Sequence, residues 1–328
     1  MPEGNTTSVK NFVIVGFPGL HANFYGLASA VMLFVYVCTL LGNGIFLTLF
    51  LRENRLRKPM YYIIINLAAC DVLFSTTTLP KIITKYWFSD GNISFLGCFV
   101  QMYFVHYFGS ANSFILGVMA FDRYVAVCNP LRYVNIVKNS NVMILCIACW
   151  LMAEPSALMM VIRAYPLPYC GANTIVQCYC DHVSITKLAC TDRTPYGFPA
   201  LVSAMVVLLG PLAFILFSYF SILIAVLRIS TTQGRQKTLS TCSSQLIIIS
   251  LFFLPRCFNY LAPYIGLSFS ADTQILIIML YSLLPPMINP VIYCLRTKEV
   301  KEVLAKNLAK SAFLQSVKNR VHVSALSK

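Results

Sequence analysis

Long apolar runs separated by short polar gaps dominate the sequence. The runs lie near 24–51, 60–80, 97–121, 141–163, 197–227, 244–265 and 273–295. Each is long enough to cross the roughly 30 Å hydrocarbon core of a bilayer, which takes about 20 helical residues. Pro255 and Arg256 interrupt the sixth run, but proline is tolerated in a span where neighbouring groups satisfy the freed carbonyls. The pattern predicts an all-α membrane protein in which a seven-transmembrane helix bundle occupies residues 24–295.

The composition disfavours most soluble protein classes. Of the 328 residues, 58% are apolar or aromatic and only 11% are charged, against roughly 25% in soluble proteins. Eleven acids and 25 bases are too few to coat a globule of this size, so a soluble enzyme is not expected. The net charge of +14 comes from bases in the gaps and the tail rather than from one continuous basic face, so nucleic acid is not an expected partner.

The distribution of lysine and arginine predicts the orientation of the chain. If the N-terminus is extracellular, 18 of the 25 bases lie in segments that face the cytoplasm, as the positive-inside bias requires. We therefore expect an extracellular segment at 1–23, without a cleaved signal peptide, and a cytoplasmic segment at 296–328. Asn5 and Asn92 begin glycosylation sequons on the outer side; Asn5 is the better candidate because Asn92 lies close to the membrane.

The cysteines fall into two groups. Eight of the 13 lie within or at the ends of apolar runs, where cysteine usually acts as a small buried hydrophobe. The other five flank or occupy outer polar segments, an oxidising environment; they are Cys98, Cys170, Cys178, Cys180 and Cys190. A bridge from Cys98 to the loop at about 164–196 would tie that loop over the bundle. The spacing leaves the connectivity open and one cysteine unpaired.

Polar residues inside the apolar runs are candidates for function, because burying them in a membrane is costly. Asp71 lies in the middle of the second run, and other polar residues lie at similar depths in neighbouring runs: Asn43, Asn66, Asn112, Ser113 and Asn289. One interpretation is a hydrated cluster that holds a cation such as Na⁺ and changes its packing between two states. The other is static hydrogen bonding between helices.

Three features lie at the cytoplasmic ends of the runs. The triplet Asp122-Arg123-Tyr124 closes the third run; its acid and base either hold each other in one state, or the arginine extends to water. The string Asn289-Pro290-x-x-Tyr293 ends the seventh run, where proline makes either a hinge or a passive kink. From Thr297 to about Leu314, apolar residues alternate with lysines, which predicts an amphipathic helix on the membrane or a solvated basic tail.

Several longer strings carry a family resemblance. They are Leu56–Tyr62 (LRKPMYY), Met119–Tyr133 (MAFDRYVAVCNPLRY), Ser218–Tyr219 (SY), Lys237–Ser244 (KTLSTCSS) and Pro285–Tyr293 (PPMINPVIY). The chain resembles rhodopsin-like G-protein-coupled receptors and, within that class, vertebrate odorant receptors over nearly its whole length. Gly16–Leu20 (GFPGL) and His106 resemble the class I, fish-like branch of that family.

The resemblance implies two disulfides, Cys98 with Cys180 and Cys170 with Cys190, and leaves Cys178 as an odd thiol. The sequence departs from the family at three positions. Gln177 and Gln245 stand where the family usually has histidine, which removes possible pH or metal responses. Asn112 stands where many relatives have an acid facing Asp71, which puts a cation-linked role there in doubt.

The resemblance also implies a mechanism. A small odorant binds in the outer half of the bundle and favours a state in which the sixth helix moves outward. Arg123 and Tyr293, with Tyr219 as a partner, then form a cytoplasmic cavity for a heterotrimeric G protein. The implied G protein is stimulatory and acts on adenylyl cyclase, and the implied location is the plasma membrane. No catalytic residue, metal site or other cofactor is expected.

We expect the ligand site on four helices, at Met102, Tyr103, His106, Tyr107, Ser110, Ser203, Val207, Phe253, Arg256, Asn259, Tyr260 and Tyr281. Residues 103, 106, 107 and 110 share one helical face. Arg256 inside an apolar run is costly unless it is paired. We predict that a carboxylate on the ligand meets Arg256 with help from His106; the alternative is that Arg256 pairs with Asp272, Glu154 or a carbonyl.

Two other functions are compatible with part of this pattern. A receptor of the same fold could take an endogenous metabolite outside the nose, and tissue expression would separate that function from olfaction. A transporter would need paired broken helices, repeats or chains of charges inside the membrane, and the sequence has none of these. An enzyme is less compatible still, because no metalloprotease, nucleophile-elbow or phosphate-loop motif occurs.

Overall fold

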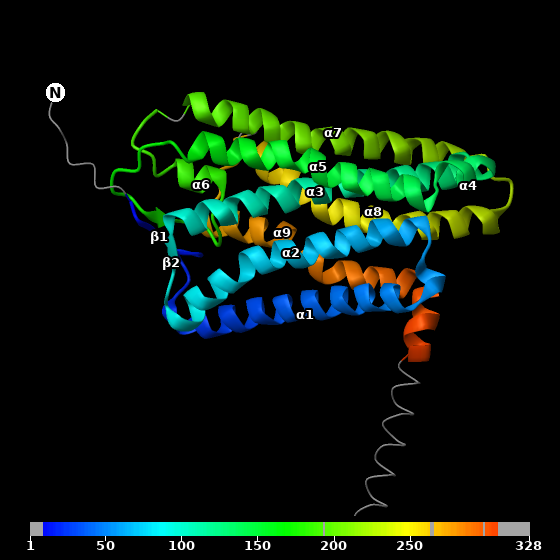
Figure 1. Ribbon diagram of the computed structural model, residues 1–328, viewed down its shortest axis with the longest axis horizontal. Helices are drawn as coiled ribbons and strands as arrows, with labels where there is room; N and C mark the ends of the chain where they lie inside the picture. Colours follow the sequence, from blue (N-terminus) through cyan, green and yellow to red (C-terminus); the bar gives the residue numbers. More distant parts are fainter. Residues whose placement is uncertain (1–8, 193, 263–265, 298, 308–328) are drawn as a thin grey trace, which may run out of the picture.

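The computed structural model describes residues 9–192, 194–262, 266–297 and 299–307. Seven long helices run side by side along the molecule (Figure 1); they are α1 (Tyr25–Arg52), α2 (Pro59–Phe88), α3 (Phe95–Cys128), α5 (Asn139–Ala164), α7 (Thr194–Leu227), α8 (Thr232–Leu261) and α9 (Ala271–Arg296). Short elements lie at the two ends of the bundle; they are α4 (Tyr133–Ile136), α6 (His182–Thr186), β1 (Asn11–Ile14), β2 (Asn92–Ser94) and β3 (Thr174–Ile175). We call the end with β1–β3 and α6 the sheet end, and the end with α4 and residues 299–307 the tail end.

Length and hydropathy identify the membrane spans. Among the described residues, six helices are long and apolar enough to cross a bilayer, and a seventh span is the bent pair Thr232–Ser240 and Gln245–Asn259 within α8, at an angle of 47°. Large apolar side chains are exposed along α1 and α7, for example Phe34 at 65% and Phe220 at 64%. Such a surface suits a lipid environment and not water. The predicted membrane bundle is confirmed.

Two helices, α2 and α8, differ most from their predicted bounds. The apolar pattern ends the second span near residue 80, but α2 continues to Phe88 past Pro80. Proline frees a carbonyl of the preceding turn, and Gln101 Nε2 donates to the Thr77 carbonyl at 2.8 Å, so a side chain from α3 supplies a hydrogen bond in that turn. The sixth span was predicted at 244–265, whereas α8 begins at Thr232, because its polar first turns extend beyond the apolar part.

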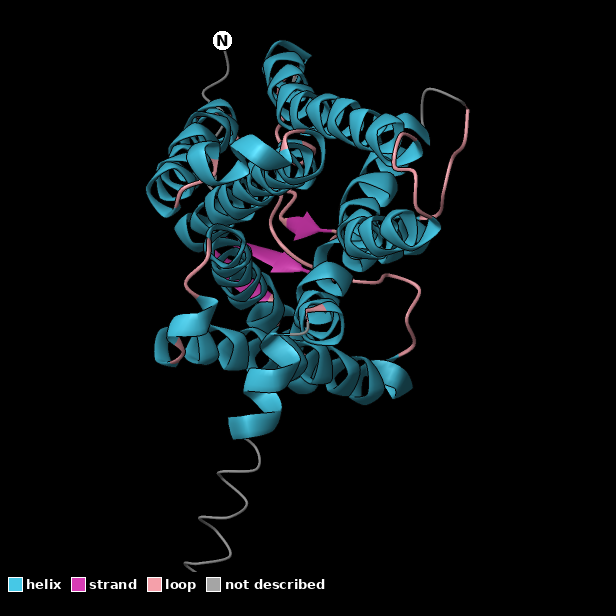
Figure 2. Cartoon of the chain, turned by 90° about the vertical axis from the view of Figure 1, so that its right-hand side faces the viewer, coloured by secondary structure: helices cyan, strands magenta, loops and turns pink. Residues whose placement is uncertain are grey.

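A small three-stranded sheet at the sheet end is absent from the predictions. Its strand order is β2-β1-β3, with β1 antiparallel to β2 and parallel to β3. Figure 2 looks along the bundle from the tail end and shows the strands within the outline of the ring of helices. Pairing of β1 with β2 and β3 therefore holds the N-terminal segment across the end of the bundle. Phe12 in β1 is fully buried, and the Phe17 N–H donates to Tyr86 Oη at 2.8 Å.

A short helix at 299–307 turns away from the bundle axis at the tail end (Figure 1). Val300 and Val303 are buried, whereas Lys301 and Lys306 are exposed, so the described part is amphipathic as predicted. The rest of the predicted helix, to about Leu314, lies outside the described residues.

Candidate functional site

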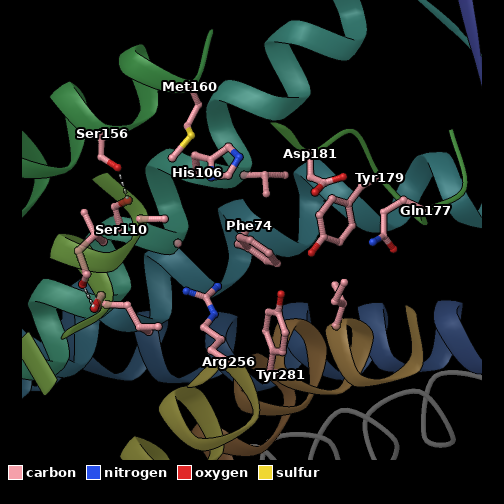
Figure 3. A pocket seen from close by; sticks show the side chains of 17 residues that line it. Phe74, His106, Ser110, Ser156, Met160, Gln177, Tyr179, Asp181, Arg256 and Tyr281 are labelled. Atoms are coloured by element: carbon pink, nitrogen blue, oxygen red, sulfur yellow. Dashed lines mark hydrogen bonds between the residues drawn. The ribbon is translucent and has the colours of Figure 1, made fainter. Parts of the chain in front are cut away.

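A cavity of about 100 Å³ lies inside the helical bundle toward the sheet end, and we call it the central cavity. Figure 3 shows side chains from the helices and from the loop after α5 converging on it. Its lining consists of Phe74, Val105, His106, Gly109, Ser110, Ser113, Ser156, Met160, Gln177, Tyr179, Asp181, Ala204, Val207, Leu208, Arg256, Ile278 and Tyr281. One basic side chain, one acid and several hydroxyls therefore meet in an otherwise largely apolar space.

Arg256 projects from α8 into the central cavity (Figure 3), and it forms no ion pair with an acid in the described ranges. Its guanidinium carbon lies 4.3 Å from the centre of the Phe252 ring and 5.1 Å from that of Tyr281, which are cation–π contacts. Its Nε is buried and has no hydrogen-bond partner among the described residues. The head group lies close to Gly109, where a Cβ would be in van der Waals contact with Arg256 Nη2 at 3.4 Å.

The two acids considered as partners of Arg256 are occupied elsewhere. Both carboxylate oxygens of Asp272 accept from the Gly19 N–H at 3.1 Å, so this acid holds the N-terminal segment. Glu154 accepts from the Tyr103 hydroxyl at 2.5 Å. No ion pair of Arg256 occurs within the described ranges, so the pairings with Asp272 and Glu154 are not formed.

Hydroxyl groups from three helices meet at one side of the cavity. Ser203 Oγ on α7 lies 3.3 Å from Ser156 Oγ on α5, and Ser110 Oγ on α3 lies 3.5 Å from the same atom. His106 on α3 lies one turn toward the sheet end from Ser110 and points into the cavity (Figure 3). Its Nε2 is buried and lacks a partner in the described structure, so it is available to a ligand.

The loop between α5 and α7 covers the cavity from the sheet end and contributes Gln177, Tyr179 and Asp181 (Figure 3). Tyr179 Oη lies 3.2 Å from Ser282 Oγ on α9, and the Cys180 N–H donates to Gln101 Oε1 at 2.9 Å. Asp181 accepts from the Ser184 N–H at 3.3 Å and caps α6. Burial raises the pKa of Asp181, although its hydrogen bonds at Ser184 oppose the shift.

A cluster of amides surrounds Asp71 in the middle of the bundle. Asp71 is 1% exposed and accepts from Asn289 Nδ2 at 2.7 Å and from Asn112 Nδ2 at 3.4 Å. Asn43 instead donates at 2.9 Å to the Pro286 carbonyl and so joins α1 to α9. The Oδ1 atoms of the three asparagines are buried without partners among the described residues. The cluster thus presents several free oxygens around one carboxylate.

A second large cavity, of about 420 Å³, opens at the tail end and is lined by residues that include Arg123, Gln245 and Tyr293. Arg123 Nε lies 3.8 Å from Asp122 Oδ2, so the predicted acid–base pair is present. Asp122 also accepts from the Tyr133 hydroxyl at 2.9 Å. Tyr293 Oη is buried without a partner in the described part of the chain, which leaves it able to bind elsewhere.

Two further contacts define the walls of this tail-end cavity. The Tyr219 hydroxyl donates to Gln245 Oε1 at 3.3 Å and joins α7 to α8. Glu299 forms an ion pair with Lys58 and accepts from the Tyr61 hydroxyl at 2.8 Å. Partial burial raises the pKa of Glu299, but the bonds from Lys58 and Tyr61 outweigh it and hold that pKa below its usual range. Tyr124, in contrast, lies against Phe217 with 6.2 Å between ring centres and does not line the cavity.

Comparison with known proteins identifies the family. A family model described as olfactory receptor matches residues 32–311. The chain belongs to the olfactory receptor family. It is similar to Homo sapiens olfactory receptor 10A5, with 34% identity over 96% of this chain and 99% of the relative. It is also similar to Homo sapiens olfactory receptor 10G7, with 38% identity over 95% of this chain and 99% of the relative.

A solved structure agrees with this assignment at the level of the fold. Squid rhodopsin superposes with a TM-score of 0.69 at 19% identity, and the match covers 91% of each chain. The chain is therefore a multi-pass membrane receptor of the seven-helix class and not an enzyme. Family membership makes it an odorant-sensing, G-protein-coupled receptor with a small-molecule ligand and a G-protein partner.

The receptor contains both disulfides that the resemblance implied. Cys98 at the start of α3 is bonded to Cys180, and Cys170 is bonded to Cys190. Cys178 is free and buried. Of the two sequons, Asn92 is exposed in β2, and Asn5 lies outside the described residues.

Five of the twelve predicted ligand residues line the central cavity of the receptor: His106, Ser110, Val207, Arg256 and Tyr281. Ser203 does not line it but contacts Ser156, which does. The other predicted residues with described side chains lie elsewhere: Met102, Tyr103, Tyr107, Phe253 and Asn259. The side chain of Tyr260 lies outside the described part.

Helix geometry explains why some of the predicted residues on α3 do not line the central cavity. Tyr103 and Tyr107 are one turn apart, and His106 and Ser110 form a second pair rotated by about 60° from the first at 3.6 residues per turn. Tyr103 and Tyr107 stack with their ring centres 5.8 Å apart, and Tyr107 contacts Trp150 on α5. Met102 is 0% exposed and belongs to the packed core, as does Phe253 at 1%.

The sequence reasoning missed twelve lining residues: Phe74, Val105, Gly109, Ser113, Ser156, Met160, Gln177, Tyr179, Asp181, Ala204, Leu208 and Ile278. Gly109 and Ser113 could have been found, because they extend the face of His106 and Ser110 along α3. The loop residues had no such signal, since their positions depend on the sheet and the disulfides.

The bond between Tyr103 and Glu154 predicts a stability effect. We expect Tyr103→Phe to destabilise the receptor by about 1–3 kcal/mol, because it leaves a carboxylate at the edge of the bundle without its donor. The measurement is the thermal unfolding of detergent-solubilised receptor. Tyr107→Phe is the matched control, because no hydrogen bond of its hydroxyl occurs among the described residues. Equal melting temperatures for the two variants would contradict the assignment.

Proposed function

We propose that the central cavity is the odorant site of this receptor and that it binds a small carboxylate through Arg256. The observation that carries the proposal is the partly buried guanidinium, which has ring contacts but no ion pair among the described residues. A charge inside a membrane bundle is costly unless an opposite charge compensates it. A carboxylate ligand would supply that charge, and His106 Nε2 could donate or accept a further hydrogen bond.

The size of the cavity limits the ligand. A dry cavity of roughly 150 Å³ holds one benzene molecule, whereas drug-sized ligands occupy roughly 300–1,000 Å³. The central cavity measures about 100 Å³, which suits an acid with a short carbon chain. Ser110 and Ser156, which line the cavity, offer hydroxyls to a polar substituent of the ligand.

The helix α8 connects the ligand site to the tail end. It carries Arg256 in the central cavity and Gln245 in the wall of the tail-end cavity. A ligand that binds Arg256 better in one position of α8 shifts the population toward that position, by no more than its difference in affinity for the two states. We propose that the favoured state widens the tail-end cavity and admits a stimulatory G protein, which raises cyclic AMP.

The ion pair of Asp122 and Arg123 predicts a change in basal activity. We expect Asp122→Asn to raise ligand-independent cyclic AMP by up to about fivefold, because the loss of a pair worth on the order of 1 kcal/mol frees Arg123. Tyr133→Phe is the control, since it removes one hydrogen bond to Asp122 but keeps the charge. An unchanged basal signal in Asp122→Asn at equal surface expression would contradict this role.

The orientation of the receptor is also a proposal. We place the sheet end and the N-terminus outside the cell and the tail end in the cytoplasm, because the positive-inside bias supports this orientation. Epitope tags on both termini test this placement in intact and permeabilised cells. The N-terminal tag should bind antibody in intact cells, and the C-terminal tag only after permeabilisation. Labelling of both tags in intact cells would rule out an odd number of spans.

The amide cluster around Asp71 is a further proposed site, for Na⁺. A buried carboxylate beside unpartnered oxygens of Asn112 and Asn289 offers the ligands that a hard cation prefers. We expect the receptor to melt at a higher temperature in sodium chloride than in choline chloride, and Asp71→Asn to remove the difference. Identical melting of the unmodified receptor in the two salts would exclude the site.

A further inference from the structure

A third cavity lies beside the central one, and we call it the side cavity. It measures about 400 Å³ and is formed by α3, α5, α6 and α7. Its lining consists of His106, Met160, His182, Val183, Thr186, Lys187, Gly197, Phe198, Ala200, Leu201 and Ala204. His106, Met160 and Ala204 also line the central cavity, so these side chains form a wall that the two spaces share.

The side cavity contains two imidazoles that the protein leaves unsatisfied. His182 on α6 is 5% exposed, and its Nε2 is buried without a hydrogen-bond partner in the described chain. His106 Nε2, from the wall shared with the central cavity, is also buried without a hydrogen-bond partner among the described residues. A buried nitrogen without a partner is destabilising, and a hydrogen bond to a ligand oxygen in the cavity would remove that penalty.

The charge of the lining favours an anion. Burial lowers the pKa of His182 to about 4, so its imidazole is neutral at physiological pH and can donate one N–H. Lys187 is the one charged residue among the described lining residues, and it is exposed at the end of α6. The Thr186 hydroxyl is already used, since it donates to the His182 carbonyl at 2.7 Å. The remaining lining is mostly apolar.

We propose that the side cavity is a second binding site for aliphatic carboxylates, with Lys187 and His182 recognising the carboxylate and α7 holding the hydrocarbon chain. This proposal rests on the proposed function, because it assigns the ligand class of the central cavity, small carboxylates, to the side cavity as well. The volume falls within the roughly 300–1,000 Å³ of small-molecule sites, so this cavity accepts longer chains than the central one does. The shared wall at His106 places the two bound molecules next to each other.

Fluorine NMR of the purified full-length receptor in lipid nanodiscs tests the proposal, with a trifluoromethyl-labelled butyrate as the probe. We expect two bound resonances. His182→Phe should remove one of them or weaken its site at least tenfold, and Arg256→Leu should remove the other. Ala200→Trp fills the side cavity from α7 and should reproduce the His182→Phe spectrum. Leu209→Ala, at an exposed position of α7 outside the cavity, should keep both resonances.

The outcomes separate the two proposals. A single bound resonance that only Arg256→Leu removes would overturn the side site and leave the proposed function standing. A resonance sensitive to His182→Phe, together with none sensitive to Arg256→Leu, would support the side site and refute the role of Arg256. If His182→Phe and Ala200→Trp both leave every bound resonance unchanged, the side site is refuted. The resonance that depends on Arg256 also reports that the His182→Phe variant is folded.

Discussion

Replacing Arg256 by leucine should weaken the response to short-chain carboxylic acids by about 10- to 150-fold. Hydrogen bonds to charged groups are worth roughly 1.5–3 kcal/mol, and each 1.4 kcal/mol changes affinity about tenfold. The guanidinium has no acidic partner among the described residues, so the substitution removes a ligand contact without leaving a protein carboxylate unpaired. The measurement is the acid concentration that gives half-maximal cyclic AMP in cells.

Three controls make this result specific. Arg256→Lys keeps a positive charge and should retain part of the response to acids. Leu254→Ala changes an exposed residue of the same helix and should leave the response unchanged. Any alcohol or aldehyde that activates the receptor should act equally on Arg256→Leu and on the unmodified receptor. An unchanged acid response of Arg256→Leu, at equal surface expression, would refute the carboxylate site.

The second large effect concerns the disulfides. Cys98 and Cys180 are 82 residues apart, and Cys170 and Cys190 only 20. Because the entropy of loop closure grows with loop length, we expect Cys98→Ser to destabilise the receptor by roughly 4–5 kcal/mol and Cys170→Ser by roughly 3 kcal/mol. Cys98→Ser also releases the loop that covers the central cavity, so surface expression and ligand response should both fall sharply.

Thermal unfolding of solubilised variants, together with surface staining, measures this difference. Cys178→Ala is the control, because Cys178 is buried in the same loop but is not part of a disulfide. Cys178→Ala should lower the melting temperature less than either disulfide variant does. If Cys98→Ser and Cys170→Ser melt at the same temperature, loop length does not determine how strongly each disulfide stabilises the receptor.

The spans were the part of this receptor that the apolar pattern predicted, whereas the pairing of the cysteines followed only from the family resemblance. A run of about 20 apolar residues has few alternatives to a membrane helix, so the seven runs coincide with the seven long helices. The ends were less predictable, because they depend on contacts between elements. Where α2 continues past Pro80, Gln101 of α3 donates to the Thr77 carbonyl, and no pattern within α2 shows that contact.

The lining of the central cavity was predicted in part, because most of it also depends on contacts between elements. Arg256 stood out in the sequence because a charge in an apolar run is rare. Its partner could not be chosen from the sequence, and in the structure Asp272 instead contacts Gly19 and Glu154 contacts Tyr103. Side chains from the loop, such as Tyr179, reach the cavity because β3 pairs with β1 from the distant N-terminal segment. Pairings of that kind leave no periodic signal in the sequence.

Nucleotide exchange by a purified stimulatory G protein, in the presence of the purified receptor in nanodiscs, tests the central claim most directly. The account predicts that a short-chain carboxylate accelerates exchange on the unmodified receptor and that Arg256→Leu abolishes most of this acceleration at the same acid concentration. If the acid accelerates exchange equally on both receptors, or if no carboxylate accelerates exchange on the unmodified one, the central cavity is not the site that couples a small acid to the G protein.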